Sequence, residues 1–290
     1  MRAIAAPASL KEVLSAVAAA EALAAGLRAG GAESIAVPVA DGGEGTLEVL
    51  GGDLRDADVS APLGGRVRAC WSLQDDGTAV VESAQALGFH TVSELDPVRA
   101  SSRGLGELIV AAAHEARSLL VCLGGTVTVD GGAGMREVLD ELPLPTRVAC
   151  DVLSPLLDAA YVFAGQKGAT EGQLDSLAER LRGLPDVPGS GAAGGLGGAF
   201  AALGAELLAG AELVLDEIDF DPSGYDLVVT GEGAVDETTW AGKAPGEVVR
   251  RCRDARVRCH LFSARDDLSG EPAQADRDLF ELGERLGRAG

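Results

Sequence analysis

Aromatic residues are scarce in this chain of 290 residues, at only 3% of the total. The hydrophobic content is 47%, so the core must be built mainly from Ala, Val and Leu, with 40 glycines available for turns. No apolar run is long enough to span a membrane, and no segment has the features of a secretory signal peptide. We therefore expect a cytoplasmic protein.

Basic residues are also few. Lys and Arg number 24 against 45 Asp and Glu, which gives a formal net charge of −21. This charge argues against nucleic acid or an anionic membrane as a partner. An anionic substrate would need local positive groups or a bound cation. The five cysteines form no CxxC pair, which argues against structural zinc and against a disulfide framework.

Lysine and asparagine are unusually rare. Asparagine is absent, and Lys11, Lys167 and Lys243 are the only lysines among the 24 basic residues. A surface position tolerates exchange of Lys for Arg, whereas a site that needs a compact ammonium group does not. All three lysines lie in or beside loops of small residues, so we treat them as functional candidates, with chance survival as the alternative.

Residues 37–46 combine the end of an apolar strand, a glycine-rich turn and the start of a helix. The turn carries Asp41 and Glu44 beside Gly42 and Gly43. Glycine lets a ligand approach the backbone closely, and the free N–H groups at a helix start can hold an anion. The two carboxylates would repel a bare phosphate, but they suit a divalent cation or a substrate hydroxyl. Helix capping is the ordinary alternative.

Two similar turns follow at residues 123–134 and 229–236, each with acids among glycines after an apolar run. In open α/β sheets, ligands bind beyond the carboxyl ends of the strands. Three such acid–glycine turns favour one shared cleft over three unrelated helix caps.

The order of elements predicts an α/β protein. A strand–helix–strand–helix pattern over residues 2–50, with its first helix over 10–29, begins a doubly wound sheet. Three strands without intervening helices, over 57–83, then mark a change of architecture, and a βαβ pattern returns near residue 222. We predict a discontinuous Rossmann-like domain (1–56 and 222–290), an inserted mixed α/β domain (57–221) and a cleft between them.

Common catalytic motifs are missing. Neither a GxSxG elbow nor a P-loop occurs, and residues 189–194 match GxGxxG without a convincing strand before them. Glycine turns, carboxylates at strand ends and three lysines suit phosphoryl transfer instead. In that chemistry backbone amides and Lys hold phosphates, carboxylates hold Mg²⁺, and one carboxylate takes the proton of the attacking hydroxyl.

Several segments together carry a more specific signal. They are residues 38–46, 102–109, 130–135, 148–152, 166–169, 188–195 and 230–236. At these residues, in the same order and over nearly the whole chain, the sequence resembles the type I glycerate kinases. The resemblance implies two α/β domains, one Rossmann-like and split, with the site in the cleft. It also implies that ATP and Mg²⁺ serve to phosphorylate D-glycerate to phosphoglycerate, with 2-phosphoglycerate as the expected product. The oligomeric state stays open, with a homodimer as one option.

The resemblance and the residue types together indicate the site. The predicted catalytic residues are Lys11, Asp41, Glu44, Asp236 and Lys243. The predicted substrate- and nucleotide-binding residues are Ser9, Gly42, Gly43, Ser102, Arg103, Thr126, Asp130, Asp151, Gln166, Lys167, Gly191, Gly194 and Glu232. Asp41 and Asp236 are the predicted Mg²⁺ ligands, although the residue types do not separate the base from the metal ligands.

The sequence departs from the family pattern at the expected site. Ala8 stands where an Asp is usual, and Val129 and Ser154 stand where amides are usual. These losses favour an alternative, in which the chain is a weakened or inactive glycerate-kinase-like paralogue that acts as a binding or regulatory protein. A Rossmann dehydrogenase is the third hypothesis.

Overall fold

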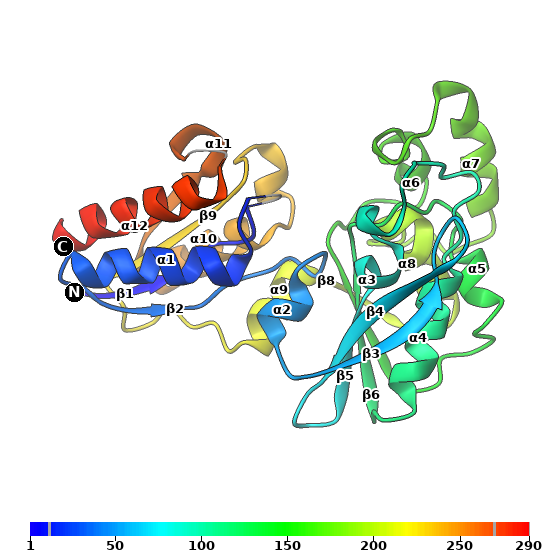
Figure 1. The fold of residues 1–290 in the computed structure, drawn as a ribbon, viewed down its shortest axis with the longest axis horizontal. Helices are drawn as coiled ribbons and strands as arrows, with labels where there is room; N and C mark the ends of the chain where they lie inside the picture. The colour runs from blue at the N-terminus through cyan, green and yellow to red at the C-terminus, as the bar shows by residue number, and fades with distance from the viewer. Residues whose placement is uncertain (11–12, 269–270, 290) are drawn as a thin grey trace. The chain divides into compact units, whose positions relative to one another are not determined.

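The computed structural model describes residues 1–10, 13–268 and 271–289. The chain divides into two compact units: Met1–Asp41 with Val214–Gly290 form the first, and Gly42–Leu213 form the second. Each unit has its own sheet (Figure 1). The predicted α/β class is confirmed, whereas domain limits at residues 56 and 221 stay a prediction. No helix in the described part of the chain is long and apolar enough to cross a membrane.

The first unit contains a four-stranded sheet in which all strand pairs are parallel. In spatial order its strands are β10 (Arg258–Ser263), β9 (Leu227–Glu232), β1 (Arg2–Ala5) and β2 (Glu33–Ala36). The two central strands, β9 and β1, are buried along almost their whole length. Their apolar sequences follow from this position, because parallel strands are covered on both faces.

Helices α1 (Ala16–Ala29) and α12 (Pro272–Arg288) of this unit pack in direct backbone contact. Gly26 permits the contact, since a Cβ there would lie 2.0 Å from the carbonyl oxygen of Phe280. Helix α1 begins later than the predicted residue 10, because the hydroxyl of Ser15 accepts a backbone N–H of the first turn and caps the helix there. The unit also contains η4 (Glu237–Trp240), α10 (Ala244–Ala255), α11 (Ala264–Asp267) and part of α9 (Gly210–Glu217).

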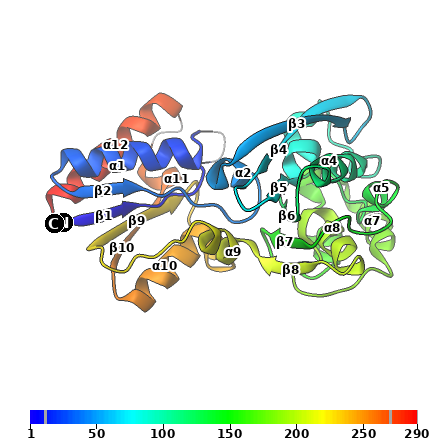
Figure 2. The same ribbon diagram turned by 90° about the horizontal axis from the view of Figure 1, so that it is seen from below.

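The second unit contains a six-stranded mixed sheet in the order β3-β4-β5-β6-β7-β8 (Figure 2). The strands are β3 (Asp53–Ser60), β4 (Arg66–Leu73), β5 (Thr78–Glu82), β6 (Ser118–Leu123), β7 (Thr146–Cys150) and β8 (Glu206–Ala209). The first three pair antiparallel and the last four pair parallel. The carboxyl ends of β5, β6 and β7 therefore lie at one edge of the sheet.

The core of the second unit packs on this sheet. Trp71 of β4, Leu105 of α4 and Phe200 of α8 belong to one buried apolar cluster. Its other members are mainly Ala, Val and Leu, as the scarcity of aromatics predicts. The helices of the unit are α2 (Thr46–Leu50), α3 (Ser83–Leu87), η1 (Phe89–Thr91), α4 (Arg103–Ala113), α5 (Ala133–Arg136), α6 (Asp158–Tyr161), η2 (Gly165–Lys167), η3 (Glu171–Gln173), α7 (Leu174–Leu181) and α8 (Ala192–Ala202).

Candidate functional site

Two of the three acid–glycine turns lie side by side at the carboxyl edge of the mixed sheet. A Cβ on Gly124 would lie 2.7 Å from the Cα of Gly43 and 2.6 Å from Oδ2 of Asp151. A Cβ on Gly125 would lie 3.2 Å from Oε2 of Glu44. The absence of a side chain at these two glycines thus allows the turn after β6, the turn before α2 and the acid after β7 to meet.

Glu82, the last residue of β5, holds the turn before α2 in place. Its Oε2 accepts the backbone N–H groups of Gly45 at 3.1 Å and Leu47 at 2.9 Å. The residue is 1% exposed, and burial raises the pKa of its carboxyl, although these two N–H groups act in the opposite direction. Sequence reasoning missed Glu82, although an acid at the end of an otherwise apolar strand was a usable signal.

Lys167 is buried in the same unit, with only 4% of its surface exposed. Its Nζ donates to Oγ1 of Thr126 at 3.2 Å and to the carbonyl oxygen of Thr128 at 2.9 Å, so it links η2 to the turn after β6. Burial lowers the pKa of this ammonium to about 8, while the carboxylates of Asp151 and Asp130 act to raise it. The lysine therefore places a positive charge among the acids of the site.

The start of α8, where Ala193, Gly194 and Gly195 have non-helical φ and ψ, approaches the same turn through its backbone. A Cβ on Gly194, whose φ is 75°, would lie 1.9 Å from the carbonyl oxygen of Thr128. A Cβ on Gly191 would lie 2.2 Å from the carbonyl oxygen of Pro155. The hydroxyls of Thr128 and Ser154 are buried and have no hydrogen-bond partner among the described residues. Such groups are available to a ligand.

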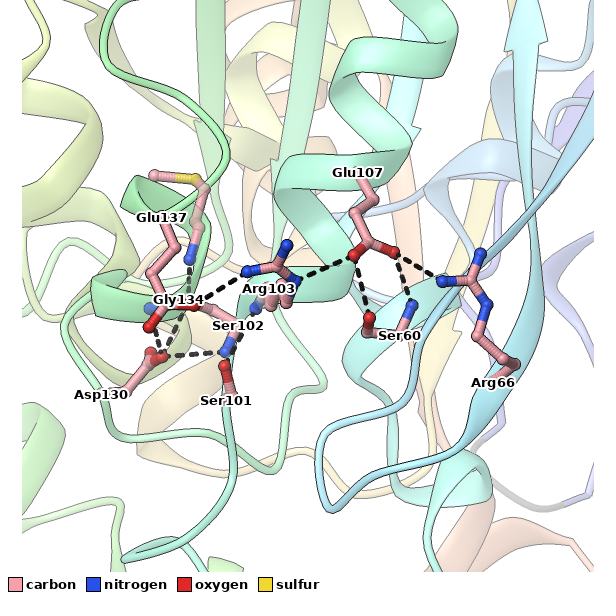
Figure 3. Close-up of polar contacts among 10 residues, drawn as sticks. Ser60, Arg66, Ser101, Ser102, Arg103, Glu107, Asp130, Gly134 and Glu137 are labelled. Atoms are coloured by element: carbon pink, nitrogen blue, oxygen red, sulfur yellow. Dashed lines mark hydrogen bonds and ion pairs between the residues drawn. The ribbon is translucent and has the colours of Figure 1, made fainter.

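Asp130 joins the starts of two helices (Figure 3). Its Oδ2 accepts the backbone N–H and the hydroxyl of Ser102, both at 2.8 Å, and the N–H of Gly134 at 3.1 Å. The Ser102 hydroxyl in turn accepts the N–H of Met135 at 2.9 Å. Both Asp130 and Ser102 are buried. This network gives the two residues a structural role, and their ligand-binding roles stay predictions.

Arg103 points toward carboxylates in the same view (Figure 3). Its guanidinium lies 3.1 Å from Glu107 and 2.9 Å from Glu137, with 45% of the side chain exposed. Glu107 also lies 3.3 Å from the guanidinium of Arg66. The cation of Arg103 is thus neutralised within the unit, and the predicted anion contact stays a prediction. Gln166, another predicted binding residue, is exposed beside Lys167.

The third acid–glycine turn belongs to the first unit. There the Nζ of Lys243 lies 3.2 Å from Oε2 of Glu232, and Thr239 donates to Oε1 of Glu232 at 2.6 Å. Asp236 accepts the hydroxyl and the N–H of Thr238, at 2.5 Å and 2.8 Å. These bonds hold the pKa of the Asp236 carboxyl below its usual range, and the charge of Lys243 adds to the effect.

The loop after β1 lies beside this third turn. The N–H of Ala8 donates to the carbonyl oxygen of Gly231 at 2.9 Å, and Ser9 follows directly. Asp41 is half-buried at the end of the first segment of the unit. Lys11 lies outside the described residues.

The predicted residues therefore fall into two groups. The second unit contains Gly42, Gly43, Glu44, Ser102, Arg103, Thr126, Asp130, Asp151, Gln166, Lys167, Gly191 and Gly194. The first unit contains Ser9, Asp41, Glu232, Asp236 and Lys243. Within the second unit, hydrogen bonds join Ser102 to Asp130 and Lys167 to Thr126. Within the first unit, an ion pair joins Lys243 to Glu232.

A magnesium site is compatible with the carboxylates of the first unit. In residues 1–10, 13–268 and 271–289, no three or more His, Cys, Asp or Glu side chains are grouped to hold a metal ion. Mg²⁺ does not need such a group, because it keeps several waters and binds through one or two carboxylates plus substrate phosphates. Asp236, which is exposed and favoured in its ionised form by Thr238, meets that requirement.

Comparisons with known proteins point to one family. The family profile described as Glycerate kinase family matches residues 3–141 and 142–279. Glycerate 2-kinase of Escherichia coli K12 is 37% identical, over 84% of this chain and 80% of that protein. Glycerate kinase of Bacillus subtilis 168 is 39% identical, over 89% of this chain and 83% of that protein.

A solved structure shows the same fold. It is a crystal structure from Salmonella typhimurium LT2, whose protein carries the provisional name glycerate kinase 2. It aligns with a TM-score of 0.81 and 30% identity, over 100% of this chain and 98% of that chain. The profile match and the identities extend over most of the sequence, so the chain belongs to the glycerate kinase family.

Proposed function

We propose that this chain transfers the γ-phosphoryl group of ATP to D-glycerate in the presence of Mg²⁺, with 2-phosphoglycerate as the product. The observation that carries this proposal is the meeting of Glu44, the Gly124–Gly125 turn and Asp151 at one sheet edge. Family membership supports glycerate as the acceptor, since relatives from Escherichia coli and Bacillus subtilis are named glycerate 2-kinase and glycerate kinase.

The chain's own groups suit the steps of such a transfer. Glu44 is exposed beside Gly125, and its carboxylate accepts the proton of the attacking glycerate hydroxyl. The buried ammonium of Lys167 and the unpartnered hydroxyl of Thr128 provide donors for anionic oxygens. Lys243 forms an ion pair with Glu232 within the first unit, and its catalytic role stays a prediction.

The metal ion would be held by Asp41 and Asp236. When bound, it would neutralise negative charge on the phosphates and so lower the cost of transfer. Because the proposal assigns Asp41 and Asp236 to the metal ion, Glu44 is the predicted catalytic carboxylate that is left to act as the base.

The direct test is ADP formation by the purified protein with D-glycerate, ATP and Mg²⁺. Enolase, added without a phosphoglycerate mutase, identifies the product, because it consumes 2-phosphoglycerate and leaves 3-phosphoglycerate unchanged. Glu44→Gln should lower kcat by roughly 10²–10⁴-fold, since it removes the proton acceptor. Glu171→Gln, at an exposed glutamate of η3, is the matched control and should leave kcat unchanged.

One outcome would overturn the proposed activity, and a second would overturn the role of Glu44 alone. One is a complete lack of turnover in a folded protein that is stabilised by glycerate or nucleotide, which would favour the non-catalytic paralogue. The comparisons do not support that alternative. The other is full activity of Glu44→Gln, which would move the base to another carboxylate.

A further inference from the structure

A cavity of about 520 Å³ lies at the carboxyl end of β5 in the second unit. Its apolar walls are formed by Leu47 of α2, Leu54 of β3 and Ala84 of α3. The volume falls within the range of roughly 300–1,000 Å³ that is typical of small-molecule sites. The transfer proposed above uses only Glu44 of the lining, so the rest of the cavity has no assigned role.

The ionisable groups that line the cavity disfavour the negatively charged parts of the substrates, which are the phosphates and the carboxylate. They are the acids Glu44, Glu48 and Glu82, the thiol of Cys70 and the imidazole of His90. None of the described residues in the lining is a lysine or an arginine. A polyphosphate and the carboxylate of glycerate both need positive groups, so neither suits this cavity. The part of the two substrates that remains is the neutral, flat base of the nucleotide.

Two polar side chains of the cavity, those of Gln85 and Glu82, accept backbone N–H groups, which fixes their directions. Gln85 accepts the N–H of Cys70 through Oε1 at 3.4 Å, and Glu82 accepts two N–H groups of α2. Carboxylate and amide oxygens favour a ligand that donates hydrogen bonds. The amino group of adenine donates, whereas the 6-oxo group of hypoxanthine would place an acceptor against acids.

The cavity adjoins the turn at which we place phosphoryl transfer. Glu44 lines the cavity and also lies against Gly125. Gly88, two residues before His90 of the lining, pairs with Thr126, whose hydroxyl accepts a hydrogen bond from Lys167. A space with apolar walls and three carboxyl groups thus lies next to glycine turns and an ammonium group, which is the order of properties along a nucleotide from base to phosphates.

We propose that this cavity binds the base of the nucleotide substrate and selects a 6-amino purine over a 6-oxo purine. The inference rests on the proposed function in one respect, the use of a nucleotide. Its test therefore needs a measurement that does not depend on turnover.

Labelling of Cys70 supplies that measurement, because its thiol lines the cavity. Cys122, Cys150 and Cys252 are buried, so a Cys259→Ser background leaves Cys70 as the accessible thiol among the described residues. Saturating adenosine should slow labelling at least about fivefold, with inosine much less effective at the same concentration. Glycerate and inorganic tripolyphosphate should give no protection.

A second variant tests the cavity wall through kinetics. Leu54 is 65% exposed, so Leu54→Ala should fold normally. It should raise the KM for ATP roughly tenfold through loss of contact with the base, while kcat and the KM for glycerate stay within about twofold. Leu157→Ala, at an exposed leucine of the same unit outside the cavity, is the control.

The outcomes separate the two proposals. Protection by adenosine without any kinase turnover would support the base site and overturn the proposed function. Turnover with ATP, combined with no protection by adenosine and an unchanged KM in Leu54→Ala, would overturn the base site alone. Equal protection by adenosine and inosine would overturn the selection of a 6-amino purine.

Discussion

The buried ammonium of Lys167 makes the stability of the second unit depend on pH in a defined direction. Its pKa is about 8 in the folded protein, against 10.5 for an ordinary lysine. Between these values the unfolded chain binds more protons than the folded chain, so this group makes folding more favourable as the pH rises. Below pH 8 the full cost of burying the charge is present.

The expected size follows from the two pKa values. Integrated between pH 7 and pH 9, the difference in bound protons favours the folded state by about 1 kcal/mol. Lys167→Met removes the titrating group, so the wild type should gain about 1 kcal/mol relative to this variant over the same interval. The variant also leaves the carbonyl of Thr128 without its donor, but that loss is the same at both pH values.

The assay is urea unfolding followed by tryptophan fluorescence. Trp71 is 2% exposed in the core of the second unit, and Trp240 is 59% exposed in the first unit, so a Trp240→Phe background reports the second unit alone. Leu157→Ala is the control, because it removes no titratable group. If the free-energy difference between wild type and Lys167→Met is the same at pH 7 and pH 9, the proposed burial of a charged lysine is wrong.

Two further predictions concern the backbone and polar contacts of the same unit. Gly194→Ala should cost about 3 kcal/mol or more, because its Cβ would lie 1.9 Å from a carbonyl oxygen at a φ of 75°, whereas Gly183→Ala, also at positive φ but in open space, should cost about 1 kcal/mol. Equal urea midpoints for the two variants would contradict the close approach. Ser102→Ala should cost about 2 kcal/mol, because it removes a donor to Asp130 and an acceptor for Met135. Ser101→Ala should cost clearly less by the same fluorescence measurement, and a reversed order would contradict the network in Figure 3.

Local pattern was enough to predict the class of the fold. The apolar strands, the glycine turns and the alternation with helices depend on neighbouring residues, and the α/β class followed from them. The segments at 102–109, 130–135 and 230–236 similarly indicated the family, because their residue order is specific over the whole chain. The first residue of α1 was harder to predict, because Ser9 and Ser15 are both residue types that cap helices. The structure shows that Ser15 is the cap.

The roles of single side chains depended on residues far away in the sequence. Asp130 and Ser102 are predicted ligand contacts, and the structure adds a second role, because Ser102 donates two hydrogen bonds to Asp130 between two helix starts. Lys167 is buried against the turn after β6, a position that its own loop of small residues does not indicate.

The sequence by itself therefore determined the class of the fold and the family, because both are encoded in local patterns and in the order of motifs. The tertiary structure decided that Glu82 caps α2 and that a cavity without lysine or arginine in its described lining forms beside it. The physical reason is the order of the strands: parallel pairing of β5, β6 and β7 brings turns from distant parts of the chain to one edge. The burial and the charged surroundings of Glu82 and Lys167 depend on the residues that these turns bring around them.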